Sequence, residues 1–197
     1  MKELKVRIKF LEDVLGSSPA NSELLTEYIA SKAEDAAKIE EEVAALGADA
    51  VEEKAMTVFP KDEDGNPFLW DYQIRGFFKS ACQALNMADA KGKLTAYKKK
   101  IDLLVFIAER KIPYILPEGG KIDTMQRPLR GQTAQGERIA LAKSETIPAG
   151  TTCEFTIRIL EDSLLKRVKD WLDYGQFNGL GQWRNASYGR FTWEELE

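Results

Sequence analysis

Apolar and charged residues alternate at the start of the chain, between Leu4 and Phe10. A period of two is typical of a strand with one buried face, so this segment is predicted to be a strand. The same alternation recurs from Cys153 to Leu160. The segment Glu137 to Ser144 and the final stretch Tyr188 to Trp193 also favour strands.

The middle of the chain contains a run of breakers and then a second apolar region. Thr57–Pro60 and Phe68–Trp70 flank residues 61–67, which include Asp, Gly, Asn and Pro and predict a hairpin-like turn. The apolar run Ile101 to Ile107 predicts a strand, and a strand around Lys111 to Leu116 could pair with it.

Two segments have the periodicity of amphipathic helices. Tyr72 to Met87 places its apolar residues on one face, and Glu161 to Asp173 does the same. Two further helices are predicted: Ser22 to Ser31, with its apolar residues on one face, and Glu34 to Leu46, in which Ala and Glu dominate. We interpret residues 20–55 as a solvated helical insertion, with a partner-docking face as the alternative.

The order of elements is strand, helices, several strands, helix and strand. This order fits an α+β fold of ferredoxin-like type, an antiparallel sheet with helices on one face. The expected organisation is one domain over residues 1–197, with the helical insertion at about 20–55.

Composition places the chain among ordinary soluble globular proteins, since 44% of its 197 residues are hydrophobic and 30% are charged. No apolar run approaches the length of a membrane span, and Met1 is not followed by a signal-peptide core, so we expect a cytoplasmic protein. Cys82 and Cys153 stand far apart, which favours two buried, reduced thiols over a disulfide or a zinc site.

The chain contains no histidine. This absence excludes Ser-His and Cys-His nucleophile pairs, histidine bases and histidine metal sites. Lys, Tyr and carboxylates remain as acids or bases, so catalysis is disfavoured and stays open. No metal or cofactor is expected. Net charge is −4, but residues 61–130 are basic and the first 60 are acidic, which indicates a local anion site.

The strongest candidate site is the glycine-rich segment between the last predicted helix and the last predicted strand, residues 177–191. Glycine permits positive φ and lets backbone N–H groups approach an anion, and arginine matches phosphate oxygens. Its aromatic residues could stack on a base. A structural turn is the alternative. The candidate ligand-binding residues are Gly179, Gly181, Trp183, Arg184, Tyr188, Gly189 and Arg190.

Other basic and amide groups complete the candidate set. Arg75 and Lys79 form an i,i+4 basic pair on a predicted helix. Residues 126–138 read as a polar loop that could reach over a ligand, with Arg127, Arg130 and Gln132 as donors. Residues 98–100 are three lysines, which are most often only a solvated run.

Three segments together resemble the RAMP superfamily, especially the RNA-binding backbone subunits of type III CRISPR effector complexes. Residues 70–79 resemble a family segment that opens a helix; they keep Gly76 and Lys79 but lack its Pro-Gly-Ser start. Residues 142–155 resemble a strand–turn–strand ending in a P-x-G-x-x-F-like element, and the third segment is the glycine-rich loop. The order agrees over residues 1–16 and 57–197.

The resemblance implies a RAMP fold and binding of RNA or a nucleotide, with side-by-side assembly as a further expectation. Three departures are the acidic insertion, the net negative charge and the missing histidine, which many RAMP endoribonucleases use as a base. We therefore expect a non-catalytic protein that binds RNA or a small, even cyclic, nucleotide. A phage anti-defence protein that sequesters a nucleotide immune signal or mimics a CRISPR subunit fits this expectation. The alternatives are a metal-independent endoribonuclease and an interaction module for a host factor.

Overall fold

A computed structural model describes residues 1–19, 56–89, 91–133 and 136–197. The chain forms two compact units. The first consists of Met1–Val14, Pro60–Lys121 and Ile147–Glu197, and the second comprises the described parts of Leu15–Phe59 and Ile122–Thr146. The predicted helical insertion at 20–55 lies outside the described residues.

The first unit is built on a four-stranded antiparallel sheet with the order β11-β1-β10-β6. Its strands are β1 (Lys2–Phe10), β6 (Val105–Ile107), β10 (Thr152–Ile159) and β11 (Phe191–Glu195). Helix α4 (Asp71–Ala88) lies between β1 and β6 in the sequence, and α6 (Leu164–Asp173) lies between β10 and β11. Strands β1 and β10 are central, and β6 and β11 form the edges. With α4 and α6 as crossover helices, this arrangement is the ferredoxin-like plan.

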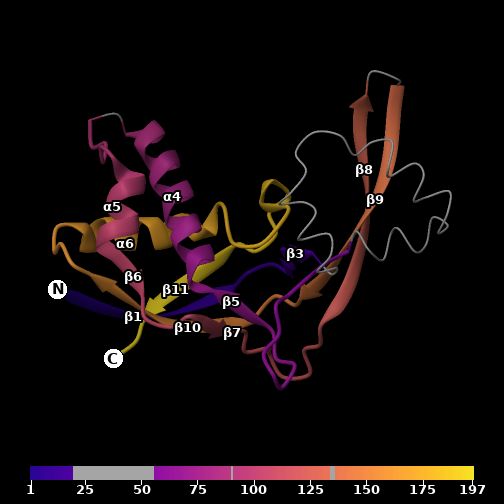
Figure 1. Cartoon of the computed structure of the whole chain (residues 1–197), viewed down its shortest axis with the longest axis horizontal. Coiled ribbons are helices and arrows are strands. Elements are labelled where there is room, and N and C mark those ends of the chain that lie inside the picture. Colours follow the sequence, from indigo (N-terminus) through magenta and orange to yellow (C-terminus); the bar gives the residue numbers. More distant parts are fainter. Residues whose placement is uncertain (20–55, 90, 134–135) are drawn as a thin grey trace. The chain divides into compact units, whose positions relative to one another are not determined.

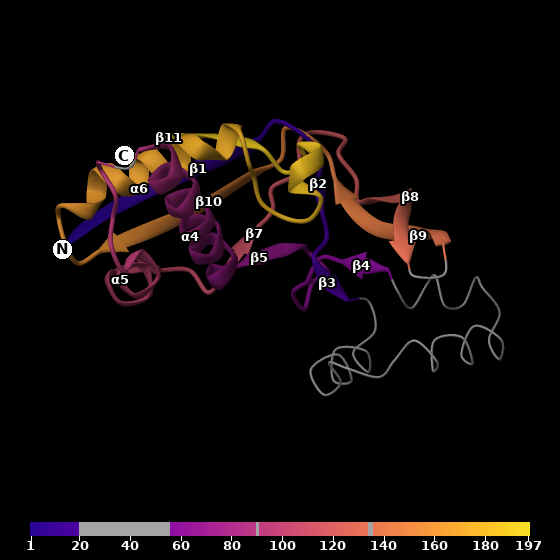
Figure 2. The same cartoon turned by 90° about the horizontal axis from the view of Figure 1, so that it is seen from above.

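Helices cover one face of this sheet, as Figures 1 and 2 show for α4 and α6. The alternating residues Leu4, Val6, Ile8 and Phe10 of β1 are at most 1% exposed. In β10 the residues facing the same way, from Cys153 to Ile159, are equally buried. The predicted strand alternation is therefore confirmed, and burial of these side chains supplies the main driving force for the sheet.

The helices bury the apolar faces that their periodicity predicts. In α4 the buried residues are Ile74, Phe77, Phe78, Ala81 and Cys82. Trp171 of α6 contacts Phe78, with ring centroids 5.6 Å apart, and Phe77 lies 5.1 Å from Phe191 at the start of β11. These rings connect both helices to the sheet and fix the point where the last strand begins.

The prediction of a strand over Ile101–Ile107 was wrong for its first half. Residues Tyr97–Leu104 form a helix, α5, and only Val105–Ile107 are extended. Ile101 is fully buried, and Asp102 of α5 pairs with Lys79 of α4 at 2.6 Å. A short apolar run satisfies helix and strand equally, and here packing against α4 decides for the helix.

The expected pairing of the strand near Lys111 was also wrong. Strand β7 (Lys111–Pro113) pairs with β5 (Phe68–Trp70), and not with β6. The turn before β5 has the predicted location, since the amide of Phe68 donates to the carbonyl oxygen of Pro60 at 3.0 Å and Lys61 bridges to Pro67.

The second unit contains a sheet with the order β2-β9-β4-β3, and β8 pairs with β9 at its edge. The strands are β2 (Val14–Leu15), β3 (Ser18–Pro19), β4 (Thr57–Val58), β8 (Asp123–Thr133) and β9 (Gly136–Ile147). The predicted polar loop at 126–138 is thus wrong, because residues 126–133 belong to β8 and residues 136–138 to β9, which pairs with it. An edge strand needs no buried face and accommodates Pro128, so apolar alternation is absent there.

Among the described helices, none combines the length and apolar character needed to cross a membrane.

Candidate nucleic-acid interface

The glycine-rich loop between α6 and β11 is closed at its base by backbone hydrogen bonds within the first unit. The amide of Leu180 donates to the carbonyl oxygen of Gly189 at 3.0 Å, and the amide of Gly189 donates to that of Asp13 at 2.9 Å. The amide of Leu11 donates to the carbonyl oxygen of Arg190 at 2.7 Å. The ends of the loop are therefore held together next to the end of β1, as in a compact Ω-loop.

Two of its glycines are required by close backbone contact. A Cβ atom on Gly179 would lie 1.7 Å from the carbonyl oxygen of Gly189, and one on Gly189 would lie 1.8 Å from that of Leu180. Gly189 also has a φ of +70°. These two predicted site residues thus have a structural task, and the amide of Gly189 already has an acceptor inside the fold.

Between these glycines the backbone turns sharply. Gly181, Trp183 and Ser187 have φ values of +86°, +52° and +69°, and a short 3₁₀ turn, η2 (Arg184–Ala186), lies between the last two. Left-handed conformations at non-glycine residues are uncommon and cluster at functional sites. The rings of Trp183 and Tyr188 meet edge to face, with centroids 6.1 Å apart, so each has an aromatic partner inside the loop.

The two arginines of the loop have different surroundings. Arg184 is exposed on η2 and, within the described residues, its side chain makes neither an ion pair nor a hydrogen bond. The guanidinium of Arg190 pairs with Glu12 at 2.5 Å, and its Nε is buried without an acceptor. The side-chain oxygen of Asn178 is also buried, without a donor. Unsatisfied buried polar atoms call for a partner, which a ligand or water can supply.

The structure places the other candidates elsewhere. Arg75 pairs with Asp71 at 3.2 Å and Lys79 with Asp102, so both cations on α4 already have a carboxylate. The three lysines at 98–100 lie on α5. Arg127, Arg130 and Gln132 belong to β8 in the second unit. The loop thus brings seven of the predicted residues together, and the remaining five lie on other elements.

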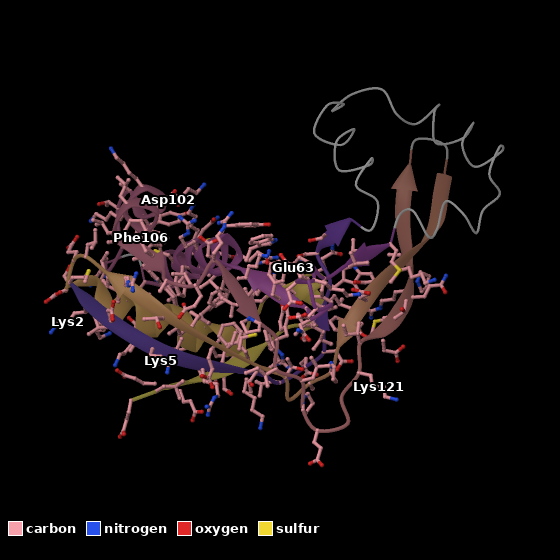
Figure 3. The ribbon with its side chains drawn as sticks, turned by 60° about the horizontal axis from the view of Figure 1, so that its bottom comes forward. Lys2, Lys5, Glu63, Asp102, Phe106 and Lys121 are labelled. Carbon is pink, nitrogen blue, oxygen red and sulfur yellow. The ribbon has the colours of Figure 1, made fainter. Side chains whose placement is uncertain are left out.

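The open face of the first sheet carries charged residues in cross-strand pairs. Arg7 of β1 bonds Glu154 of β10 at 2.6 Å and Glu194 of β11 at 2.9 Å, and Arg158 bonds Glu3 at 2.8 Å. These neighbours raise the pKa of Arg7, first through the hydrogen bond to Glu154. Figure 3 shows Lys5, on this face, and Asp102, near the helices, on opposite sides of the sheet. Both arginines of this face are therefore already paired with carboxylates.

A second cluster of aromatic and basic side chains lies where β5 meets α4, and none of its residues belongs to the predicted site. The rings of Trp70 and Tyr72 are nearly parallel, at 17°, with centroids 6.2 Å apart. The guanidinium carbon of Arg110 lies 5.1 Å from the Trp70 centroid and 6.0 Å from that of Tyr72. A Trp-x-Tyr spacing was visible in the sequence, but nothing there connected it to Arg110.

Both thiols and the Tyr114 hydroxyl lie in the interior of the first unit. Burial raises the pKa of the Cys153 and Cys82 thiols and that of the Tyr114 hydroxyl. Both cysteines are free and buried, as predicted. In the described part of the chain, no group of His, Cys, Asp and Glu side chains could hold a metal ion.

No protein-family model matches the sequence, and no curated protein matches it. A solved chain from the type III-B Cmr-β complex, bound to cognate target RNA, matches all of this chain at 12% identity with a TM-score of 0.56. The present chain spans 60% of that chain's length. A chain of a type IV-B CRISPR complex matches 99% of this chain and 90% of its own length, at 11% identity and a TM-score of 0.47.

The described residues therefore form an α+β protein with a four-stranded antiparallel sheet and three α-helices, and its fold is similar to that of a chain of the type III-B Cmr-β complex. The predicted fold class is confirmed. The likeness is one of fold.

Proposed function

We propose that this chain is a non-catalytic RNA-binding protein that contacts the phosphate backbone through its glycine-rich loop. The observation that carries the proposal is Arg184, an exposed guanidinium without a carboxylate partner among the described residues, on a loop with left-handed backbone at four positions. The fold adds support, since the matching Cmr-β structure contains bound target RNA. Arginine binds phosphate through charge-assisted hydrogen bonds.

The test is the affinity of Arg184→Ala for a labelled single-stranded RNA, measured by fluorescence anisotropy. A hydrogen bond to a charged group contributes about 1.5–3 kcal/mol, so we expect the affinity to fall by about 10- to 150-fold. The slope of log affinity against log salt should decrease by about one unit, because one phosphate contact is lost. The melting temperature should stay unchanged, since the side chain is exposed.

Arg158→Ala is the matched control. It removes a half-exposed arginine from the ion-paired sheet face, and RNA affinity should stay at the wild-type value. Equal affinities for Arg184→Ala and the wild-type protein would contradict the assignment of the loop.

More specifically, we propose that the chain is a phage anti-defence protein, which sequesters a nucleotide immune signal or mimics a CRISPR subunit. A sequestering protein acts by mass action and needs no turnover. Cyclic and linear nucleotides in the same titration separate this role from RNA binding. An intact RNA after prolonged incubation would argue against the endoribonuclease alternative.

A further inference from the structure

The cluster of Trp70, Tyr72 and Arg110, named here the Trp70 cluster, is positioned by local backbone pairing. Strands β5 and β7 place Trp70 opposite Lys111, and the amide of Asp71 donates to the carbonyl oxygen of Arg110 at 3.2 Å. Arg110 therefore lies directly beside the first turn of α4. Two segments far apart in the sequence thus contribute a cation and two rings to one spot.

The guanidinium of Arg110 is held at one corner only. Its Nη1 donates a hydrogen bond to the carboxylate of Asp71. The same carboxylate, whose side chain is 13% exposed, also accepts a hydrogen bond from Nη2 of Arg75 at 3.2 Å. The Arg110 side chain as a whole is 65% exposed. The Arg110 guanidinium is therefore oriented before any ligand binds, while most of the side chain remains exposed to solvent. Such preorganisation lowers the entropic cost of binding.

The rings also have open surface. Tyr72 is 51% exposed and Trp70 is partly exposed, whereas Phe68 beneath Trp70 is only 4% exposed and supports it edge to face at 4.7 Å. Lys111 adds a second cation, 5.2 Å from the Phe68 ring. If the cluster served only to stabilise the start of α4, exposure of Tyr72 and Arg110 would bring no benefit, because exposed cation–π contacts stabilise weakly.

We propose that the Trp70 cluster is a stacking site for an unpaired nucleobase of single-stranded RNA. The base lies against the exposed face of Tyr72 or of the Arg110 guanidinium, and Arg110 and Lys111 attract the adjoining phosphates. Stacking on aromatic rings and on arginine tolerates any base, so the site has little sequence preference. This inference rests on the proposed RNA binding and assigns a second contact, apart from the glycine-rich loop.

The experiment compares two oligomers of equal length and charge, a single-stranded RNA of about 16 nucleotides and an abasic oligomer with the same number of phosphates. Tyr72→Leu removes the aromatic face and keeps apolar volume, and Tyr72→Phe keeps the face. Removing one stacked base contact should weaken RNA binding by Tyr72→Leu about five- to 150-fold. Tyr72→Phe should bind RNA like the wild-type protein, and Arg110→Lys should lose affinity because it keeps the charge without the planar fork.

Phe106→Leu is the matched control, since Phe106 of β6 is an exposed aromatic residue, at 39%, in the same unit and is not a member of the Trp70 cluster. Its RNA affinity should not change. The abasic oligomer should bind all Tyr72 variants equally well. Wild-type RNA affinity in Tyr72→Leu, or an equal loss for the abasic oligomer, overturns the stacking site.

The outcomes also separate this inference from the proposed role of the loop. Loss of RNA affinity in Tyr72→Leu but not in Arg184→Ala would remove the loop and leave the Trp70 cluster as the site. The reverse result would remove the cluster alone. Failure of the wild-type chain to bind either oligomer would overturn both.

Discussion

At the scale of single residues, the glycine-rich loop depends on close contact between two backbone segments, at residues 179–180 and at residue 189. Gly189 combines a left-handed φ with a carbonyl oxygen 1.8 Å from the place of a Cβ atom. Because that atom belongs to the backbone of Leu180, no side-chain movement relieves the clash. The glycines at 179 and 189 therefore shape the loop, and its capacity to bind rests on the residues between them.

We predict that Gly189→Ala lowers the free energy of unfolding by more than about 1 kcal/mol, because the left-handed backbone alone costs an alanine about that much. Urea unfolding followed by circular dichroism measures the change. The control is Gly76→Ala, an exposed position in the interior of α4 where a Cβ atom meets nothing within 4 Å. Alanine there should stabilise the protein by about 0.5–1 kcal/mol. Similar effects of the two substitutions would refute this explanation.

At the scale of elements, the turn before β5 is organised by one carboxylate. Oδ1 of Asp62 accepts hydrogen bonds from the amides of Asn66 at 2.8 Å and Asp64 at 3.0 Å. The hydrogen bond from the Asn66 backbone is the main cause that holds the pKa of Asp62 below its ordinary value of 3.8. The ionised form therefore stabilises the turn that leads into Trp70.

The pH dependence follows from the sign of this shift. Asp62 contributes stability above its unfolded pKa, and this contribution disappears as the pH falls through the lower folded value. We predict that the Asp62 carboxyl carbon titrates at a lower pH in the native protein than in the urea-unfolded chain, measured by NMR. The Asn66 amide resonance should shift with the same midpoint. Identical midpoints for the native and unfolded chains would show that the turn does not stabilise the charge.

At the scale of the whole molecule, both thiols lie inside the first unit. Cys153 is fully buried in the sheet and Cys82 is 2% exposed on α4. A thiol reacts as the thiolate, and burial raises the pKa of both groups.

We predict that neither thiol reacts rapidly with Ellman's reagent in the native protein, and that both become reactive over the same range of urea concentration. A Ser163→Cys variant, with its thiol at an exposed position, supplies the control for rapid reaction. Fast modification of one native cysteine would reveal local opening of its element, separate from global unfolding.

The ferredoxin-like plan could be predicted from three signals in the sequence. These are the alternation in β1 and β10, the apolar faces of α4 and α6, and the order of these elements. The predictions failed where local signals conflict or are absent. Residues 101–104 satisfy a helix and a strand alike, and β8 shows no apolar alternation because it is an edge strand. In both cases, contacts made by distant residues decide the structure.

The sequence by itself determined the fold class, the missing histidine chemistry and the composition of the glycine-rich loop, because periodicity and residue type are local properties. Only the tertiary structure decided which charges remain available. It pairs Arg75, Lys79 and Arg190 with carboxylates, leaves the exposed Arg184 without an ion pair in the described chain, and brings Arg110 to Trp70 and Tyr72. Ion pairs and ring contacts form between residues far apart in the chain, so their partners depend on strand register and helix packing.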